Sequence, residues 1–366
     1  MRPWTWTRKI PVVAYNPFLV HARRVHSYSF HVFRDVPPLR QLRRELGKSN
    51  RTVGLVPTMG ALHDGHLSLV RQAAAENTDV FVSIYVNPTQ FGVNEDLDSY
   101  PRTWDADMEK LERLNRELRS DQGGSVTAVF APTTKVMYPT IPPTSEIDGH
   151  GSFVTITPLA NKLEGASRPV FFRGVATVCT KLFNIATPDR VYFGQKDVQQ
   201  CVVIKRLVKD LHIDTEVRIG ATVRDPDGLA MSSRNAYLGS RRRAVGLVLY
   251  RALHAGELAF NSGKRTREEI LDAARRVADD TLASQKALLP SERALFEVDY
   301  ISLADPETLD ELDVVDPNRG AILSGAVKMM PVEEPRPNED LGVGSGTIPV
   351  RLIDNILLMP NGHRDL

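Results

Sequence analysis

The 366-residue chain is predicted to have an α/β fold, with a mainly parallel sheet covered by helices on both faces and a smaller α+β domain after it. Short apolar runs alternate with segments of helical spacing as far as about residue 222, a pattern typical of parallel sheets. Beyond that point, two long helical stretches precede three strand-like runs. The polar motifs follow strands, which is where ligands bind in such sheets.

Each expected strand is a short apolar run, and each expected helix has apolar residues every three to four positions. The first part is predicted to contain, in order, helix 36–46, strand 52–56, helix 67–76, strand 80–86, helix 105–118, strand 126–130, helix 174–185, strand 190–193, helix 198–211 and strand 215–219. The second part is predicted to contain helices 241–261 and 267–286 and strands 297–302, 319–327 and 349–358.

Composition predicts a domain boundary near residue 222, with domains 31–222 and 223–366. The segment 331–346 is rich in Pro, Gly and acids, so we expect a mobile insertion there. Residues 1–30 form an Arg-bearing extension without acids. Such a start is typical of a mitochondrial transit peptide. A disordered extension or an over-long gene model explains it equally well. The expected location is cytoplasmic, or mitochondrial if the extension is a targeting signal.

Bulk properties exclude several classes of protein. The 46 basic and 45 acidic residues nearly balance, so no overall field favours nucleic acid as a partner. No apolar run is long enough to predict a membrane span. Cys179 and Cys201 lie in apolar helical patterns, where buried free thiols are expected. We therefore expect small-molecule substrates rather than a nucleic acid or a membrane.

The segment from Pro57 to His66 carries the strongest functional signal. His63 and His66 are expected in the first turn of a helix, on one face. Unpaired N–H groups and the helix dipole favour an anion there, and Gly65 lets a ligand approach the backbone. Histidines at helix starts also occur without any catalytic task, and zinc would need ligands that no Cys/His cluster supplies. The motif points to nucleotide phosphates.

Two further loops offer polar side chains after strands. Asn87 and Gln90 are amides that can hold a hydroxyl-bearing substrate without charge, although Asn-Pro is also a simple turn signal. Lys196 can contact a phosphate as a point charge. Asp197 can cap the following helix or bind Mg²⁺ beside phosphate oxygens. Gln200 is expected to face the same side as Lys196.

The fourth motif, Gly228 to Asn235, contains Met231, Ser232, Ser233 and Arg234. Two hydroxyls and a guanidinium after Met resemble the mobile phosphate-clamping loop of Rossmann-type nucleotidyl transferases, in which a Met-Ser-Lys-type segment accompanies H-x-G-H. The two serines could equally be an N-cap for the next turn. By itself this motif is a weak indication of phosphate binding, and it becomes a strong one together with the other three motifs.

Taken in order, the motifs resemble those of the pantothenate synthetase (pantoate–β-alanine ligase) family, within the H-x-G-H nucleotidyltransferase superfamily. The resemblance runs from about residue 31 to 358 and includes Tyr100-Pro101-Arg102-Thr103 and the ending 351–356. It implies a Rossmann-like ATP-binding domain with a smaller C-terminal lid domain, and a homodimer. It also implies ATP-dependent condensation of pantoate with β-alanine through a pantoyl adenylate, which releases AMP and pyrophosphate.

The resemblance implies a role for each motif. His63, His66 and Lys196 would hold the ATP phosphates, with Ser232, Ser233 and Arg234 closing from the other domain. Gln90 and Gln200 would hold pantoate, with Asn87 nearby. The remaining implied contacts are Met59, Gly194, Asp197 and Met231 for ATP, Asp197 for Mg²⁺, and the loop Leu163-Glu164-Gly165, in which Glu164 could also simply be exposed.

This sequence departs from the family pattern at minor positions. Asp64 stands where Glu is frequent, Gln195 replaces a frequent Glu, and Ala106 interrupts an acidic cluster, which leaves Asp105 and Asp107. None of these removes a catalytic group, so an active enzyme is expected. The alternatives are a nucleotidyl transferase that acts on a phosphate ester, and a nucleotide-binding scaffold without catalysis. Paired amides without a second cationic pocket argue against the first, and intact motifs against the second.

Overall fold

The computed structural model describes residues 28–359, except 93–96, 122, 141–142, 144–145 and 147–148. Of the predicted N-terminal extension 1–30, residues 1–27 lie outside the described part, so the possible transit peptide stays a prediction. Within the described part, none of the helices combines the length and the apolar character that a bilayer crossing requires. Cys179 and Cys201 are buried free thiols, as expected.

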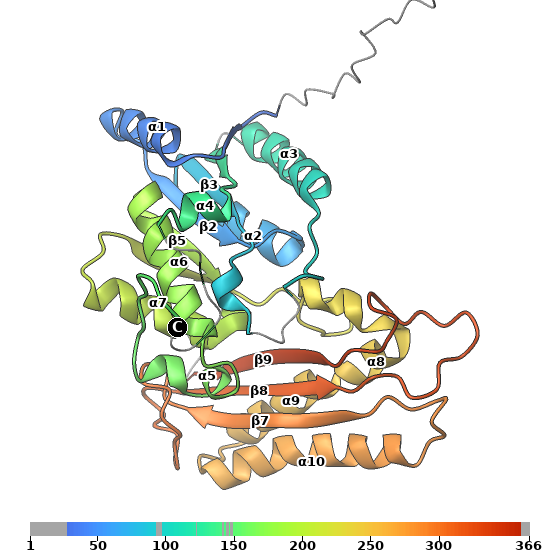
Figure 1. The fold of residues 1–366 in the computed structure, drawn as a ribbon. Helices are drawn as coiled ribbons and strands as arrows, with labels where there is room; N and C mark the ends of the chain where they lie inside the picture. The colour runs from blue at the N-terminus through green and yellow to red at the C-terminus, as the bar shows by residue number, and fades with distance from the viewer. Residues whose placement is uncertain are drawn as a thin grey trace, which may run out of the picture.

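The predicted parallel sheet is confirmed and has six strands in the order β1-β4-β3-β2-β5-β6 (Figure 1). All of its pairings are parallel. Five strands match the prediction to within about two residues, whereas β1 was not predicted because three residues are too few to show a period. The strands are β1 His31–Phe33, β2 Val53–Thr58, β3 Asp79–Ile84, β4 Ser125–Phe130, β5 Arg190–Gly194 and β6 Glu216–Gly220.

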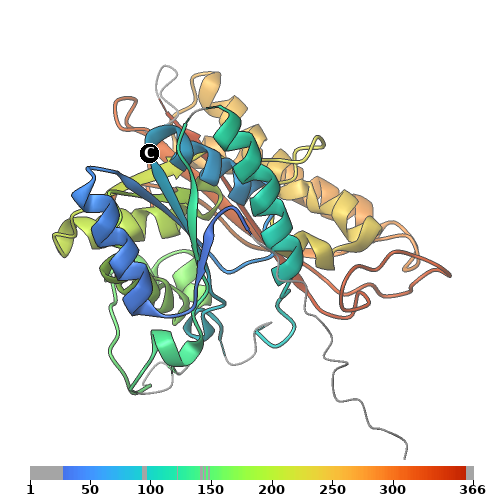
Figure 2. The ribbon, with the colours of Figure 1, turned by 90° about the horizontal axis from the view of Figure 1, so that it is seen from above.

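Helices cover both faces of this sheet (Figures 1 and 2). Side chains of β3 alternate between two cores: Val80 and Val82 pack with α2 and α3, whereas Phe81 packs with α1, α6 and α7. Burial on both faces explains why the strands are apolar throughout. The helices are α1 Val36–Lys48, α2 Asp64–Glu76, α3 Trp104–Ser120, α6 Phe171–Ala186 and α7 Val198–Asp210, with the short α4 Thr134–Met137 and α5 Glu164–Ser167.

The strand order reverses between β2 and β5, which lie side by side at the centre of the sheet. The chain leaves β2 toward β3 on one side, and leaves β5 toward β6 on the other. Loops after the two strands therefore diverge and leave a crevice at the carboxyl edge, where ligands of such sheets bind. The H-x-G-H motif follows β2, and Lys196 follows β5.

The second part contains the predicted α+β elements. A three-stranded antiparallel sheet, β7-β8-β9, packs against α9 and α10. The single helix expected over 241–261 is two helices, because the chain bends at Leu247, whose ψ of −14° lies off the helical value. A Cβ at Gly246 would come within 3.0 Å of Leu352 in β9, so the bend lies where the chain approaches the sheet. The elements are α8 Gly239–Gly246, α9 Val248–Asn261, α10 Arg267–Lys286, β7 Phe296–Ala304, β8 Ala321–Met329 and β9 Val350–Leu358.

The segment 331–346 contacts α8 and the turn before it. The carboxylate of Glu339 pairs with Arg241, and both side chains are at most 10% exposed. The Val343 N–H donates to the Ala236 carbonyl at 2.9 Å. The predicted mobility of this segment stays a prediction, and these contacts are what such motion would have to break.

Candidate active site

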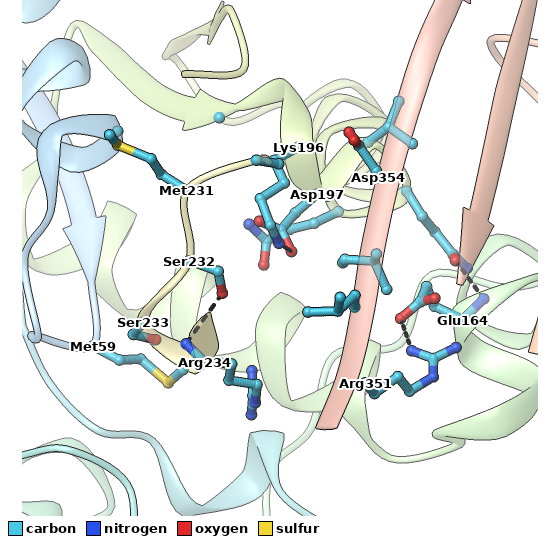
Figure 3. Close-up of a pocket in the computed structure, with 18 of the residues that line it drawn as sticks. Met59, Glu164, Lys196, Asp197, Met231, Ser232, Ser233, Arg234, Arg351 and Asp354 are labelled. Carbon is cyan, nitrogen blue, oxygen red and sulfur yellow. Dashed lines mark hydrogen bonds and ion pairs between the residues drawn. The ribbon is translucent and has the colours of Figure 1, made fainter. Parts of the chain in front are cut away.

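A cleft of about 1050 Å³ lies where the loops after β2 and β5 face the C-terminal part (Figure 3). Its volume is at the upper end of the range for small-molecule sites. The structure brings together nearly all the residues that the sequence singled out. Those lining the cleft are Met59, His63, His66, Gln90, Gly194, Lys196, Asp197, Gln200, Met231, Ser232, Ser233 and Arg234.

The H-x-G-H motif starts α2 as expected. His63 is the N-cap residue and His66 the third helical residue, with ring centroids 4.1 Å apart. The backbone N–H of His63 donates to Nδ1 of His66 at 3.4 Å, which assigns the proton of the neutral His66 ring to Nε2. A Cβ at Gly65 would lie 2.9 Å from Cε1 of His63, so this glycine makes room for the His63 ring. The sequence had suggested only room for a ligand.

Both imidazoles are neutral at physiological pH. Burial lowers the pKa of His63 to about 4, and the Lys196 ammonium contributes to this lowering. Burial also lowers the pKa of His66 to about 3, with His63 and Lys196 contributing. The Lys196 ammonium is therefore close enough to act on both rings, as the predicted phosphate site requires. Each ring offers one N–H donor rather than a full charge.

The turn after β5 presents Lys196 and Asp197 to the cleft. Their Nζ and Oδ1 atoms are 3.9 Å apart, and the Asp197 side chain is 43% exposed. Asp197 stands at the N-cap of α7, but its carboxylate accepts no helix N–H there. Of the two roles left open by the sequence, capping is therefore wrong. A Cβ on Gly194 would meet open space, so the backbone here is accessible to a ligand.

This turn is fixed by the second sheet. The side-chain amide of Asn355, in β9, donates to the carbonyls of Gln195 and Lys196 at 2.8 and 2.9 Å. Gln195 in return donates to Oδ1 of Asn355 at 3.2 Å. The ending 351–356 resembled the family, but nothing in the sequence indicated that Asn355 contacts the lysine turn. Pairing between distant segments leaves no local pattern.

Asn87 departs from the expected substrate contact. It is 0% exposed and does not belong to the described residues that line the cleft. Its Nδ2 donates to Oε1 of Gln90 at 3.0 Å, and its Oδ1 accepts from Tyr138 and Thr89 at 2.9 and 3.1 Å. Asn87 engages the Oε1 atom of Gln90, a residue that itself lines the cleft. Asn87 therefore orients Gln90 instead of contacting a ligand.

The serine loop, residues 231–234, comes from the C-terminal side and lies across the cleft from Lys196 and Asp197 (Figure 3). Ser232 does cap the following turn, as the simpler interpretation proposed, because its hydroxyl accepts from the Arg234 N–H at 3.3 Å. The Ser233 hydroxyl lies 3.4 Å from that of Tyr100, and the Arg234 guanidinium is 6.0 Å from the Tyr100 ring. The Tyr-Pro-Arg-Thr motif thus meets the serine loop.

Glu164 is buried, with 6% exposure, so the suggestion of an exposed residue is wrong. Its carboxylate pairs with Arg351 of β9 (Figure 3). It also accepts from the Tyr300 hydroxyl at 3.0 Å. Its backbone N–H donates to Gln199 at 3.0 Å. Glu164 therefore links the two parts of the chain at one end of the cleft.

The oxygen atoms that the protein offers in the cleft suit a cation that is bound mainly by the phosphates of a nucleotide. Within the described residues, no cluster of three or more His, Cys, Asp or Glu side chains forms a metal site. Asp197 lines the cleft with a 43% exposed carboxylate, whereas the cleft carboxylates of Glu164, Asp299 and Asp354 are paired with arginines. Mg²⁺ typically takes one or two carboxylates together with phosphate oxygens and water, so this residue fits Mg²⁺ bound with a nucleotide. A catalytic zinc site, which needs three protein ligands, does not fit the described part.

Comparison with known proteins shows the family to which the chain belongs. The sequence profile of the family described as pantoate-beta-alanine ligase matches residues 31–357. A pantothenate synthetase of Roseiflexus castenholzii is 43% identical over 325 residues, 89% of this chain and 99% of that protein. The pantoate–beta-alanine ligase of Saccharomyces cerevisiae is 41% identical, over 90% of this chain and 99% of its own.

Solved structures agree with the sequence comparison. Pantothenate synthetase from Thermus thermophilus superposes with a TM-score of 0.69 at 36% identity, covering 90% of this chain and 100% of that one. A pantoate-beta-alanine ligase from Francisella tularensis, complexed with beta-gamma ATP and beta-alanine, gives a TM-score of 0.62 at 30% identity over 90% of this chain and 98% of that one. The fold predicted from the sequence is thereby confirmed.

Proposed function

The chain belongs to the pantoate-beta-alanine ligase family, and from that premise we propose how its cleft joins pantoate to β-alanine. The protein is an ATP-dependent ligase of pantothenate synthesis. The observation that carries the assignment of the site is the convergence of two neutral imidazoles, Lys196 and the serine loop on one cleft at the strand-order reversal.

The reaction has two steps. A carboxylate oxygen of pantoate attacks the α-phosphorus of ATP, the bond to the β-phosphate oxygen breaks, and pyrophosphate leaves. The amine of β-alanine then attacks the acyl carbon of pantoyl adenylate, loses a proton, and AMP leaves with the carboxylate oxygen. No side-chain nucleophile is required. Catalysis comes from orientation, worth roughly 7–11 kcal/mol in favourable cases, and from donors placed at developing charge.

Charge develops on the departing pyrophosphate in the first step. We assign its stabilisation to the Lys196 ammonium, to the Nε2–H of His66 and to the N–H of His63. Ser232, Ser233 and Arg234 approach from the opposite wall. Neutral imidazoles suit this role, because they donate hydrogen bonds without requiring an acidic pH. Met59, Gly194 and Met231 line the same cleft, and we assign them to the nucleotide.

Pantoate is assigned to Gln90 and Gln200. Asn87 fixes the Oε1 atom of Gln90, so Nε2 is presented as a donor to the pantoate carboxylate or hydroxyl. Gln200 lines the cleft from the first turn of α7. Uncharged amides can bind a hydroxy acid without neutralising the carboxylate that has to attack.

We assign Mg²⁺ to the phosphates with Asp197 as its one protein ligand. When bound, Mg²⁺ neutralises phosphate charge.

Residues 31–222 would bind ATP and pantoate, and residues 223–366 would act as a lid that carries the serine loop. The homodimer implied by the family resemblance stays a prediction, which sedimentation velocity checks. Fluorescence microscopy with and without residues 1–30 checks the choice between cytoplasm and mitochondrion.

The deciding experiment measures AMP and pyrophosphate from ATP, with pantoate and β-alanine omitted in turn. We expect pyrophosphate release with pantoate alone, limited to about one turnover, and steady AMP formation only when both acids are present. A nucleotidyl transferase acting on a phosphate ester would give no pantoate-dependent pyrophosphate. A scaffold without catalysis would bind ATP and release neither product.

A further inference from the structure

The loop between β2 and α2 has an unusual backbone. Gly60 and Ala61 are consecutive residues in the left-handed region, with φ of 83° and 50°. An L-residue such as Ala61 rarely adopts this conformation, so surrounding contacts have to maintain it. The loop leads directly into His63 and His66, so its geometry sets where both rings lie.

The contacts that maintain the loop come from α3. Asp107 accepts the Ala61 N–H on Oδ2 at 2.9 Å and the Leu62 N–H on Oδ1 at 2.8 Å. Asp107 is 1% exposed and its carboxylate also accepts from the Thr103 hydroxyl at 3.1 Å. Successive backbone N–H groups in such a turn form a concavity suited to an anion. Here the anion is a side chain of the protein itself.

One helical turn further on, Lys110 binds the same loop through a carbonyl group, whereas Asp107 binds its N–H groups. Its Nζ donates to the Leu62 carbonyl at 2.5 Å. Residues three apart lie on one face of a helix. Asp107 and Lys110 of α3 therefore bind the loop together, the first through its N–H groups and the second through its carbonyl. The Lys110 ammonium is also close enough to lower the pKa of both His63 and His66.

We propose that Asp107 and Lys110 are positioning residues for ATP, which act through the loop 60–62 on His63 and His66. The inference rests on the proposed function of the cleft. Asp107 is buried against the loop and does not belong to the described residues that line the cleft. Lys110 adds positive charge close to both imidazoles from the α3 side of the loop.

The primary variant is Asp107→Asn, which keeps the shape but turns one acceptor into a donor facing an N–H group. We expect kcat/KM for ATP in pantoate-dependent pyrophosphate release to fall about a hundredfold, the cost of misplacing a reacting group by about 1 Å. The second step, started from preformed pantoyl adenylate and β-alanine, should change by less than about threefold, because it no longer involves the pyrophosphate. Asp105→Asn is the matched control, since Asp105 is an exposed carboxylate in the same turn. It should behave as the wild type.

Lys110→Met provides a second test should Asp107→Asn fail to fold. Removing this ammonium should raise the pKa of His63 and His66, which ¹⁵N NMR of the imidazoles reports in the ligand-free protein. A lysine whose charge does not reach the imidazoles would not move these values. The NMR measurement needs no turnover, so it can be made even if the wild type makes no pantothenate. Absence of pantothenate synthesis by the wild type would refute only the proposed function. Unchanged imidazole spectra together with unchanged kcat/KM for ATP in the folded variants would overturn the positioning role.

Discussion

Replacing Lys196 by Met tests the electrostatic centre of the proposed mechanism. The substitution keeps the apolar stem and removes the ammonium. The side chain is only 18% exposed, so water cannot readily replace the lost charge. A well-placed donor to developing charge contributes about 3–4 kcal/mol. Since about 1.4 kcal/mol corresponds to tenfold, pyrophosphate release should slow by a hundredfold or more.

The assay is the initial rate of pantoate-dependent pyrophosphate release at saturating ATP. Lys209→Met is the control, because it removes an equal charge from the exposed last turn of α7. It should change the rate by less than about twofold. The Lys196→Met variant should also raise the pKa of His63 and His66, since the Lys196 charge lowers both. A wild-type rate in folded Lys196→Met protein would refute the assignment of Lys196 to the phosphates.

The remaining predictions concern neighbouring residues and pH. Gly65→Ala should lower activity at least tenfold without lowering the melting temperature, because the new Cβ displaces the His63 ring while Ala favours the helix; an unchanged rate would count against it. Asp197→Asn should raise the Mg²⁺ concentration needed for half-maximal rate, and an unaltered Mg²⁺ titration would exclude Asp197 as the ligand. Asn87→Ala should raise KM for pantoate more than KM for ATP by freeing the Gln90 amide, and equal effects on both would contradict an orienting role. The pKa values of His63 and His66 lie below 6.5 when folded, so the unfolded chain binds more protons on acidification. Urea titrations should therefore show the free energy of unfolding falling as pH drops from 6.5 toward 4, less steeply in His66→Gln.

Local sequence was sufficient for the longer helices and strands and for the motifs that line the cleft. Buried parallel strands are apolar throughout and amphipathic helices have a regular period, so both are visible along the chain. The H-x-G-H motif and Lys196 follow strands, and the carboxyl ends of parallel strands share one edge. Their convergence was therefore predictable. The strand β1 was too short to show a period, and the break at Leu247 depends on packing against β9.

The fold class, the family and the polar motifs that line the cleft were predictable from the chain before any coordinates, because they depend on patterns within short segments. How those residues are held became visible only in the packed molecule. Asn87 donates a hydrogen bond to Gln90, and Glu164 is paired with Arg351. Asp107 accepts a hydrogen bond from a loop more than forty residues away along the chain. Such contacts join segments whose spacing along the chain carries no period, so they emerge only when the chain is packed.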